Sequence, residues 1–410
     1  MQRSKYINDP IFGFIEIPQG LLYKIVTHPY MQRLSRIKQL GVTSVAYPGA
    51  QHTRFLHSVG AYFLMCEAIE QLQKKGHDIS PAEAEATKAA ILLHDVGHGP
   101  FSHVLEKTII PSINHECLSL MLMKRINKET NGALDLSIDI FTNKYDKHFM
   151  HQLISGQLDM DRLDYLRRDS FFTGVKEGNI GSERIIKMLD VRDDQLVVNE
   201  KGIYSIENFL IARRLMYWQV YLHKTSVACE RMLISALRRA KELMLFGENI
   251  YCPPILSFFF TNDISKERFT KDESVLDQFV LLDDNDIWTA LKTWSYSKDR
   301  ILVTLCQGII NRNLFKIELS DTEFDKNKVD DIAKTVAKQL SLSEQEVKYF
   351  VSSGTIENKT YNPYNDTINL LLDNQEVINI SQKSDILNVS ALNRNSKKYY
   401  LSYYRGDELL

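Results

Sequence analysis

The sequence predicts a mainly α-helical protein that carries small β-hairpins and ends in a small α+β region. The first observation is residues 82–93, a run of strong helix formers preceded by Ser80-Pro81, which is typical of a helix cap followed by proline at the first helical position. The second is the strongly helical pattern of residues 207–245. The third is a change of texture after residue 315, where alternating apolar runs follow one amphipathic helix, 325–340.

The other elements are expected from periodicity and turn signals. Residues 5–20 alternate apolar and polar positions around a turn, which predicts a hairpin, and the alternation at 195–199 predicts another. For 134–141, a strand and a short helix both remain open. Further helices are expected at 21–40 (interrupted or restarted at His28-Pro29, with a stripe of Leu34, Ile37 and Leu40), 59–74, 118–127, 158–169 and up to about 315. We expect a domain over 1–315 and a small region over 316–410.

Composition narrows the class of protein. The 410 residues are 44% hydrophobic and 25% charged, with a formal net charge of −2, as in an ordinary globular chain. This balance disfavours nucleic-acid binding through bulk charge, although a local basic pocket for phosphates stays possible. Five scattered cysteines without a CxxC pair predict reduced thiols and a cytoplasmic location. No apolar run approaches 18 residues and no N-terminal signal region is found, so neither a membrane association nor secretion is expected.

A dense group of ionisable residues follows the helix at 82–93. His94 and Asp95 come directly after a turn that is apolar on every side, so a bare charge there would be costly unless a metal or a partner compensates it. Gly97, Gly99 and Pro100 then break the helix and let the backbone approach a ligand. Because adjacent helical residues point about 100° apart, further ligands have to come from other elements.

Three other segments offer candidate partners. Asp161, Tyr165 and Asp169 recur at i, i+4 and i+8, so on a helix they share one face. The alternative for this segment is a solvated helix with pairs such as Asp164–Arg168. His57 begins an expected helix and is either a ligand or a capping or core histidine. Arg213 and Tyr221 are eight residues apart on one face of the helix at 207–245 and are candidates for phosphate and aromatic contacts.

Together, these segments supply a mixed nitrogen and oxygen donor set. It consists of two imidazoles and two carboxylates, contains no thiolate, and leaves coordination positions open for water or phosphate. Imidazoles favour one divalent transition metal (Fe, Mn, Ni or Zn), with Mg possible on the phosphates of a substrate. The proposed metal ligands are His57, His94, Asp95 and Asp161.

Residues 5–315 resemble the HD-domain phosphohydrolases and look closest to the deoxynucleoside triphosphate triphosphohydrolases, in which an HD-domain helical core is expected. Five motifs carry the resemblance, and together they are specific for the superfamily and less so for the substrate. They are Asn8-Asp9-Pro10-Ile11-x-Gly13, Gln32-Arg33-Leu34-x-x-Ile37-Lys38-Gln39-Leu40-Gly41, Pro48-Gly49-Ala50-x-His52-x-Arg54-Phe55-x-His57-Ser58, His94-Asp95-x-Gly97-His98-Gly99-Pro100-Phe101-Ser102-His103 and Asp161-Arg162-x-Asp164-Tyr165-x-x-Arg168-Asp169.

The resemblance implies a role for each matching residue. The reaction would be attack of water on the α-phosphorus of a deoxynucleoside triphosphate, which releases deoxynucleoside and tripolyphosphate. Gln39 and Asp169 would hold the sugar 3′-hydroxyl, and Leu40 with Tyr221 would crowd the 2′-position. Near the scissile phosphate, His98 and His115 would act as catalytic residues, with His115 oriented by Glu106 where the mammalian relative has Asp. The phosphate contacts would come from Arg54, His103, Arg162, Tyr165 and Arg213.

The chain also departs from that family's mammalian member. It has no SAM domain, and Thr27 and Ser35 stand where that enzyme carries an Asp and an Arg that read an activating guanine, although Gln32 is kept. Neither replacement can make a charged bidentate contact, so GTP activation of that kind is expected to be absent. By analogy, the protein is expected to form a homo-oligomer, a dimer or tetramer. The alternatives are a hydrolase of another nucleotide (a monophosphate, ppGpp or a cyclic dinucleotide) and a non-catalytic binder of nucleotides or single-stranded nucleic acid.

Overall fold

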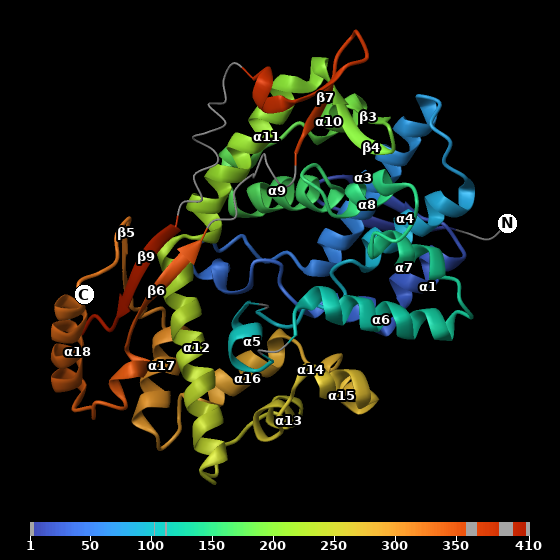
Figure 1. Ribbon diagram of the computed structural model, residues 1–410. Coiled ribbons are helices and arrows are strands. Elements are labelled where there is room, and N and C mark those ends of the chain that lie inside the picture. Colours follow the sequence, from blue (N-terminus) through green and yellow to red (C-terminus); the bar gives the residue numbers. More distant parts are fainter. Residues whose placement is uncertain (1–3, 102, 111–112, 358–366, 385–396, 407–410) are drawn as a thin grey trace.

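A helical core confirms the mainly α prediction (Figure 1). The computed structural model describes residues 4–101, 103–110, 113–357, 367–384 and 397–406. At its centre, α3 (Arg54–Lys74) packs against α4 (Pro81–Leu93) and against α9 (Met160–Thr173). These three helices deliver most of the ionisable residues singled out in the sequence.

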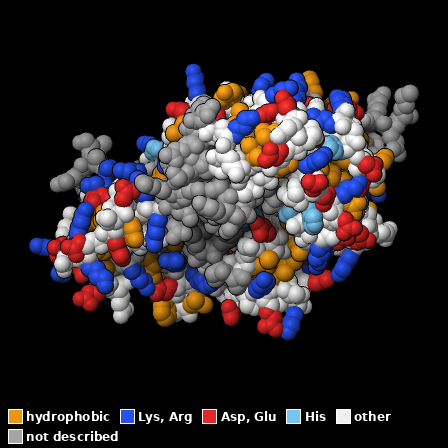
Figure 2. Space-filling model, turned by 45° about the horizontal axis from the view of Figure 1, so that its top comes forward, with side chains coloured by type: hydrophobic (Ala, Val, Ile, Leu, Met, Phe, Trp, Pro, Cys, Tyr) orange, Lys and Arg blue, Asp and Glu red, His pale blue; other side chains and the backbone are white. Residues whose placement is uncertain are grey.

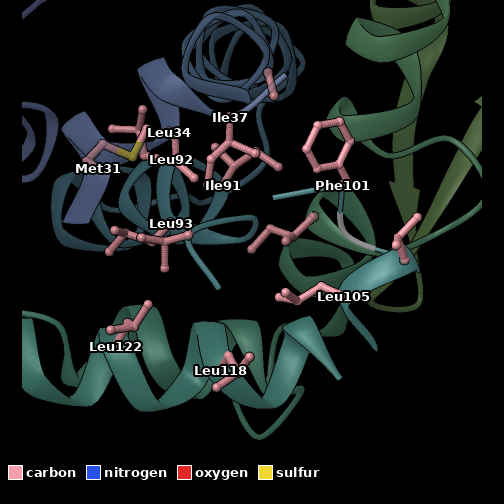
Figure 3. Packing of buried hydrophobic residues seen from close by; sticks show 14 of the residues in the cluster. Met31, Leu34, Ile37, Ile91, Leu92, Leu93, Phe101, Leu105, Leu118 and Leu122 are labelled. Carbon is pink, nitrogen blue, oxygen red and sulfur yellow. The ribbon is translucent and has the colours of Figure 1, made fainter. Parts of the chain in front are cut away.

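The last turns of α4 are buried on all sides, from Ala89 to Leu93. Figure 3 shows Ile91, Leu92 and Leu93 between the segment of Met31, Leu34 and Ile37 on one side and Leu118 and Leu122 of α6 (His115–Glu129) on the other. Each of these three α4 side chains is fully buried. The last turn of α4 is therefore fixed in position by packing on both sides.

The remaining helices surround this core. In chain order they are α1 (Leu21–Thr27), α2 (Pro29–Arg33), α5 (His103–Thr108), α7 (Asp135–Phe141), α8 (His148–Ile154), α10 (Ser182–Met188), α11 (Ile203–Met216), α12 (Lys224–Leu245), α13 (Pro254–Thr261), α14 (Lys266–Lys271), α15 (Glu273–Phe279), α16 (Asp284–Trp294), α17 (Arg300–Ile310) and α18 (Lys326–Leu340). Among the residues that the structure describes, no helix is long and apolar enough to cross a membrane.

Three small sheets complete the fold. The antiparallel hairpin of β1 (Lys5–Asp9) and β2 (Gly13–Ile17) pairs Asp9 with Gly13 at its turn. A four-stranded sheet has the order β3-β4-β7-β8, in which β4 and β7 are parallel and the other pairs antiparallel. An antiparallel sheet has the order β5-β9-β6. The remaining bounds are β3 (Leu189–Arg192), β4 (Gln195–Asn199), β5 (Lys316–Ser320), β6 (Val351–Glu357), β7 (Asn369–Leu371), β8 (Val377–Asn379) and β9 (Lys397–Tyr403).

Both predicted hairpins, the helix at 82–93 and the helix at 325–340 are confirmed, and the alternating apolar runs near the C-terminus overlap the strands β7, β8 and β9. The break expected at His28-Pro29 is confirmed, since α1 ends at Thr27 and α2 begins at Pro29. The continuation of the helix to residue 40 is wrong: α2 ends at Arg33, one 3-10 turn follows at Leu34–Arg36, and Ile37 is extended. The chain turns away here because the backbone N–H of Lys38 donates to Asp284 and Lys38 forms a β-bridge with Thr53. The open segment 134–141 is helical, as α7.

Two other helix boundaries differ from the prediction. The helix expected at 59–74 begins at Arg54, because the Thr53 side chain accepts from the Leu56 N–H and caps α3. The segment 207–245 is two helices, separated by a π-helical turn at Tyr217–Tyr221 and restarted by a cap at His223. Turns of this kind often occur at functional sites, and this one faces the cavity described below.

The C-terminal region is joined to the rest of the protein. Its strand β7 pairs with β4, and its residues Tyr349 and Phe350 belong to the main hydrophobic core. Its other sheet, β5-β9-β6, lies beside α12 (Figure 1), and Ile317, Ile356 and Tyr400 of this sheet form a small cluster with Val227 and Ala228. The division into domains at residue 315 remains a prediction.

Candidate active site

Three of the four predicted metal ligands converge on one point. His57 Nε2 lies 3.1 Å from Asp161 Oδ1, and His94 Nε2 lies 3.6 Å from the same oxygen. All three potential ligand atoms lie within 4.8 Å of one another. The helix ends account for this placement: His57 is in the first turn of α3, His94 is the C-cap residue of α4, and Asp161 is in the first turn of α9.

Hydrogen bonds fix the tautomer of both histidines. His57 Nδ1 donates to Asp164 Oδ2 at 2.7 Å, and His94 Nδ1 donates to the Ile91 carbonyl at 2.6 Å. Each Nε2 atom is consequently left with its lone pair toward the cluster, and neither has a hydrogen-bond partner among the described residues although both are buried. Two imidazole nitrogens without such partners, beside a carboxylate, fit a divalent metal. The other ring nitrogen of each histidine donates to a carboxylate or a backbone carbonyl, as is usual for metal-binding histidines.

The charges of the cluster also favour a cation. Burial lowers the pKa of His57, but the nearby carboxylates of Asp161 and Asp164 outweigh it and raise that pKa to about 10. Burial raises the pKa of Asp161, but the two histidines outweigh it and hold the pKa well below its usual range. The carboxylates of Asp161 and Asp164 therefore stabilise a positive charge at this point. A divalent metal cation can replace the proton that His57 Nε2 would otherwise carry.

A buried ion pair supports His57 from behind. Asp164 accepts two hydrogen bonds from Arg168 at 2.9 Å each, and Arg168 Nη1 donates to Asp9 Oδ2 at 2.7 Å. The side chains of Asp9, Asp164 and Arg168 are completely buried. Gly60 on α3 leaves the necessary space, since a Cβ atom there would lie 2.1 Å from both Arg168 Nη2 and Asp164 Oδ1.

The fourth predicted ligand, Asp95, lies at the edge of the cluster. Its carboxylate is 3.4 Å from His94 Nε2 and 3.7 Å from His57 Nε2, and Oδ2 accepts a 2.8 Å hydrogen bond from Arg54 Nη1. His98 Nε2 lies 3.2 Å from Asp95 Oδ1. Burial raises the pKa of Asp95, but His98, His94 and Arg54 outweigh it and keep that pKa well below its usual range.

The two catalytic histidines expected from the resemblance are neighbours. The rings of His98 and His115 stack with centroids 3.9 Å apart. Burial, followed by the nearby Arg54, lowers the pKa of His98 to about 3. The segment that follows α4 can approach α6 closely because Gly97 has no side chain: a Cβ atom there would lie 2.2 Å from the Ser119 backbone nitrogen. The side chains of His103 and Glu106 lie outside the described part of the structure.

A cavity of about 560 Å³ opens beside Arg54. It is within the size range of small-molecule sites. Of the nine predicted substrate-binding residues, seven line it: Gln39, Leu40, Arg54, Tyr165, Asp169, Arg213 and Tyr221. The eighth, Arg162, does not line the cavity, and its Nη1 instead donates to the Gly156 carbonyl and to Asp159.

One candidate sugar-binding carboxylate, Asp169, is held on both sides. Tyr221 donates its hydroxyl to Asp169 Oδ2 at 2.7 Å, and His52 Nε2 contacts Oδ1 at 2.8 Å. His52 is 2% exposed and stacks on Phe172, with ring centroids 4.6 Å apart. These bonds fix the Asp169 carboxylate and the edge of the Tyr221 ring relative to each other.

Sequence reasoning missed several residues of this site. His52 is part of one of the five motifs, but no role was predicted for it. Its position two residues before Arg54 could have indicated that it belongs to the site. Asp164 and Arg168 were read as the solvated alternative, but both are buried behind His57. The helical spacing i, i+4 identified the pair correctly, while only the packing of α9 against α3 showed which face was buried. Tyr217 also lines the cavity, from the first position of the π-helical turn.

The fold and the cluster define a class of protein. Residues 54–169 match the HD domain, and residues 180–248 match the HD associated region. The HD domain match begins at the N-terminus of α3 and ends within α9, so it contains all three residues of the cluster. The chain belongs to the HD-domain family, whose domains bind divalent metals.

Similar proteins are known over nearly the whole length. An uncharacterized protein of Bacillus subtilis, YwfO, is 31% identical, and the alignment covers 98% of this chain and 92% of that protein. A crystal structure described as a phosphohydrolase from Bacteroides thetaiotaomicron is 60% identical with a TM-score of 0.95, covering 98% of this chain and all of that chain. The human deoxynucleoside triphosphate triphosphohydrolase SAMHD1 is 28% identical over 58% of this chain and 45% of its own length.

Proposed function

We propose that the protein hydrolyses deoxynucleoside triphosphates to deoxynucleoside and tripolyphosphate. The observation that carries the proposal is the position of the cavity. Arg54, which donates to Asp95 at the edge of the His57, His94 and Asp161 cluster, lines it together with six other residues expected to hold a deoxyribose and its phosphates. The similarity to SAMHD1 from human, and to a homologue from Dictyostelium discoideum that is 26% identical over 82% of this chain, supports this class of substrate.

The sugar end of the site is built to exclude a 2′-hydroxyl. Asp169, fixed by Tyr221 and His52, offers carboxylate oxygens to a 3′-hydroxyl, and Gln39 lines the same cavity with a buried Oε1 atom that lacks a hydrogen-bond partner among the described residues. Leu40 and the Tyr221 ring add bulk without offering a partner to a second hydroxyl. A buried hydroxyl without a partner costs roughly 1–3 kcal/mol, which favours deoxyribose.

The reaction centre lies at the cluster. His57, His94, Asp95 and Asp161 would hold a divalent metal, which supplies Lewis-acid activation of water and of a phosphoryl oxygen. Arg54, held by Asp95, and Arg213 bring positive charge to the triphosphate. A water oxygen attacks the α-phosphorus, the bond to the 5′ oxygen breaks, and the departing oxygen takes up a proton. Of the two stacked imidazoles, His115 is the one we assign to that proton donation, and His98, whose pKa is lowered to about 3, is neutral at pH 7 and can accept a proton from the attacking water.

Product analysis tests this proposal. Purified protein is incubated with each of the four dNTPs, with manganese, magnesium or no added metal, and with or without GTP. Chromatography should detect deoxynucleoside and tripolyphosphate in a 1:1 ratio, and Asp161→Ala should abolish both products. Asp190→Ala, which alters a carboxylate near the surface that contacts His77, is the matched control and should retain activity. Intact dNTPs under every condition would reject the proposal in favour of another nucleotide substrate or a non-catalytic binder.

Two expectations about partners can be tested in parallel. We propose a homo-oligomer, which light scattering after size-exclusion chromatography measures directly as a mass of two or four chains. On the face shown in Figure 2, basic and acidic side chains are interspersed, so this face gives no reason to favour nucleic acid. Filter binding with a salt titration checks this, because binding to a nucleic-acid backbone weakens steeply as salt rises.

A further inference from the structure

The cavity extends beyond the residues assigned to sugar and phosphates. At this end its wall is formed by α12, with Ser226, Glu230 and Arg231, and by Thr355 and Ile356 of β6 in the C-terminal region. None of these five residues has a role in holding the metal, the phosphates or the sugar. A nucleotide bound with its phosphates at Arg54 and its sugar at Asp169 has only its base left to place.

Two polar groups at this end lack partners. Ser226 is 4% exposed, and its hydroxyl has no hydrogen-bond partner among the described residues. The Nε atom of Arg231 is likewise buried and without a partner there. A buried polar atom without a partner is costly, and natural proteins rarely leave one except at a site that binds something. Both groups belong to residues that line the cavity.

The position of the Arg231 guanidinium is fixed by the C-terminal sheet. Its Cζ atom lies over the ring of Tyr400, a residue of β9, at 4.5 Å from the ring centroid. Tyr400 in turn belongs to the cluster that joins this sheet to α12. Arg231 Nη2 is 3.9 Å from Glu230 Oε1, so a guanidinium group and a carboxylate lie next to each other at the cavity wall. This arrangement offers donors and acceptors together, in fixed positions.

We propose that this end of the cavity binds the nucleobase and selects guanine; the inference rests on the proposed function. Guanine carries two adjacent donors, N1–H and the N2 amino group, which a carboxylate accepts together, and two acceptors, O6 and N7, which an arginine fork can reach. Thymine offers a single N–H between two carbonyls. The Ser226 hydroxyl can donate to or accept from any base and adds a further contact. The C-terminal region thereby supplies a wall of the substrate site.

Binding of the four dNTPs, measured by calorimetry in the Asp161→Ala background to prevent turnover, tests the proposal. We expect dGTP to bind at least tenfold more tightly than dTTP, since a site that pairs with polar groups strongly rejects a ligand lacking them. Glu230→Gln and Arg231→Lys should each weaken dGTP binding by roughly 10- to 100-fold while changing dTTP binding less than threefold. Lysine keeps the positive charge beside Tyr400, so we expect the fold to be preserved, but it lacks the two parallel N–H donors of the guanidinium group.

Arg238→Lys, at an exposed position of the same helix, is the matched control and should leave all four affinities unchanged. Equal binding of the four dNTPs, or variants that weaken all of them alike, would overturn the selection of guanine even if the wild-type protein hydrolyses dNTPs. Conversely, a preference for dGTP that the two variants abolish would support the base site even if product analysis finds no hydrolysis, in which case the proposed reaction alone fails.

Discussion

His57 and Asp164 form a hydrogen bond of 2.7 Å in which His57 Nδ1 is the donor. The other contacts of Asp164 go to Arg168, which also pairs with Asp9 of the N-terminal hairpin. The orientation of a candidate metal ligand on α3 therefore depends on α9 and on β1. Because all three supporting side chains are completely buried, disturbing any one of them should affect metal binding and stability together.

Asp164→Asn should lower metal affinity roughly 10- to 100-fold, as loss of a carboxylate behind a metal-binding histidine usually does. The amide can still accept from His57 Nδ1, but it cannot neutralise Arg168, so the free energy of unfolding should also fall. Metal content after dialysis, measured by mass spectrometry, checks the first effect and urea unfolding the second. Asp190→Asn alters the pair between Asp190 and His77 near the surface and should leave metal content unchanged. Full metal content in Asp164→Asn would contradict this account.

Gly60→Ala should destabilise the protein by about 1–3 kcal/mol, since the added Cβ atom would overlap the Asp164–Arg168 pair. These side chains are completely buried and cannot move into solvent. Urea unfolding measures the loss, and metal content should fall with it. In Gly181→Ala the nearest atom to the new Cβ, in Arg184, is 4.0 Å away, so this control makes the same substitution without an overlap. Because Gly181 is the N-cap of α10, it should cost less than about 1 kcal/mol, and metal content should stay unchanged. Equal stability of the two variants would be evidence against the predicted overlap.

Glu83 should make stability depend on pH in the acid range. Burial raises its pKa, but hydrogen bonds from Lys147, Tyr145 and the Ser80 backbone outweigh it and lower that pKa from 4.5 to about 2. The carboxylate therefore contributes stability that is fully present above pH 4.5 and is lost as the pH falls toward 2.

Glu83→Gln should cost about 1–3 kcal/mol at pH 7 and abolish this part of the pH dependence, because an amide does not titrate. Urea unfolding at pH 7 and at pH 3 checks both effects. Glu85→Gln, at an exposed position of the same helix, is the control and should behave as the wild type. The idea fails if Glu83→Gln loses as much stability between pH 7 and pH 3 as the wild type does.

Tyr221→Ala should reduce discrimination against ribonucleotides, because the ring that crowds the 2′-position would be removed. If the protein hydrolyses dNTPs, the ratio of kcat/KM for a dNTP to that for its NTP should fall roughly 10- to 100-fold. Tyr221→Phe keeps the ring but loses the 2.7 Å bond to Asp169, so it should lower kcat/KM for both substrates and keep their ratio. An unchanged ratio in Tyr221→Ala would show that the sugar is selected elsewhere.

GTP should not stimulate hydrolysis of dATP or dCTP. The Thr27 hydroxyl donates to the Tyr23 carbonyl at 2.8 Å, and Gln32 Nε2 donates to the Val26 carbonyl at 2.7 Å, so both groups are engaged within the chain. Neither Thr27 nor Ser35 can form the charged contacts that a guanine would need. Initial rates across a GTP titration check this, and a large saturable stimulation would contradict it.

The sequence alone determined the donor set and the local structure of several elements. Capping signals at Ser80 and the periodicity of 82–93 predicted α4, and the residue types at His57, His94 and Asp161 predicted a mixed nitrogen and oxygen site. Spacing along one helix also predicted that Asp161, Tyr165 and Asp169 share a face. These are properties of neighbouring residues, and short-range geometry sets them.

Only the tertiary structure decided which of these residues act together. The pairing of Asp164 with Arg168 is readable from helical spacing, but its burial behind His57 depends on α9 packing against α3 at a glycine. The contribution of β6 to the cavity depends on its pairing with β9, which is distant in sequence, since β6 ends at Glu357 and β9 begins at Lys397. Contacts between distant segments leave no periodic pattern in the sequence. The local conformation of a segment depends on residues adjacent in sequence, whereas the segment it contacts depends on how side chains pack in the tertiary structure.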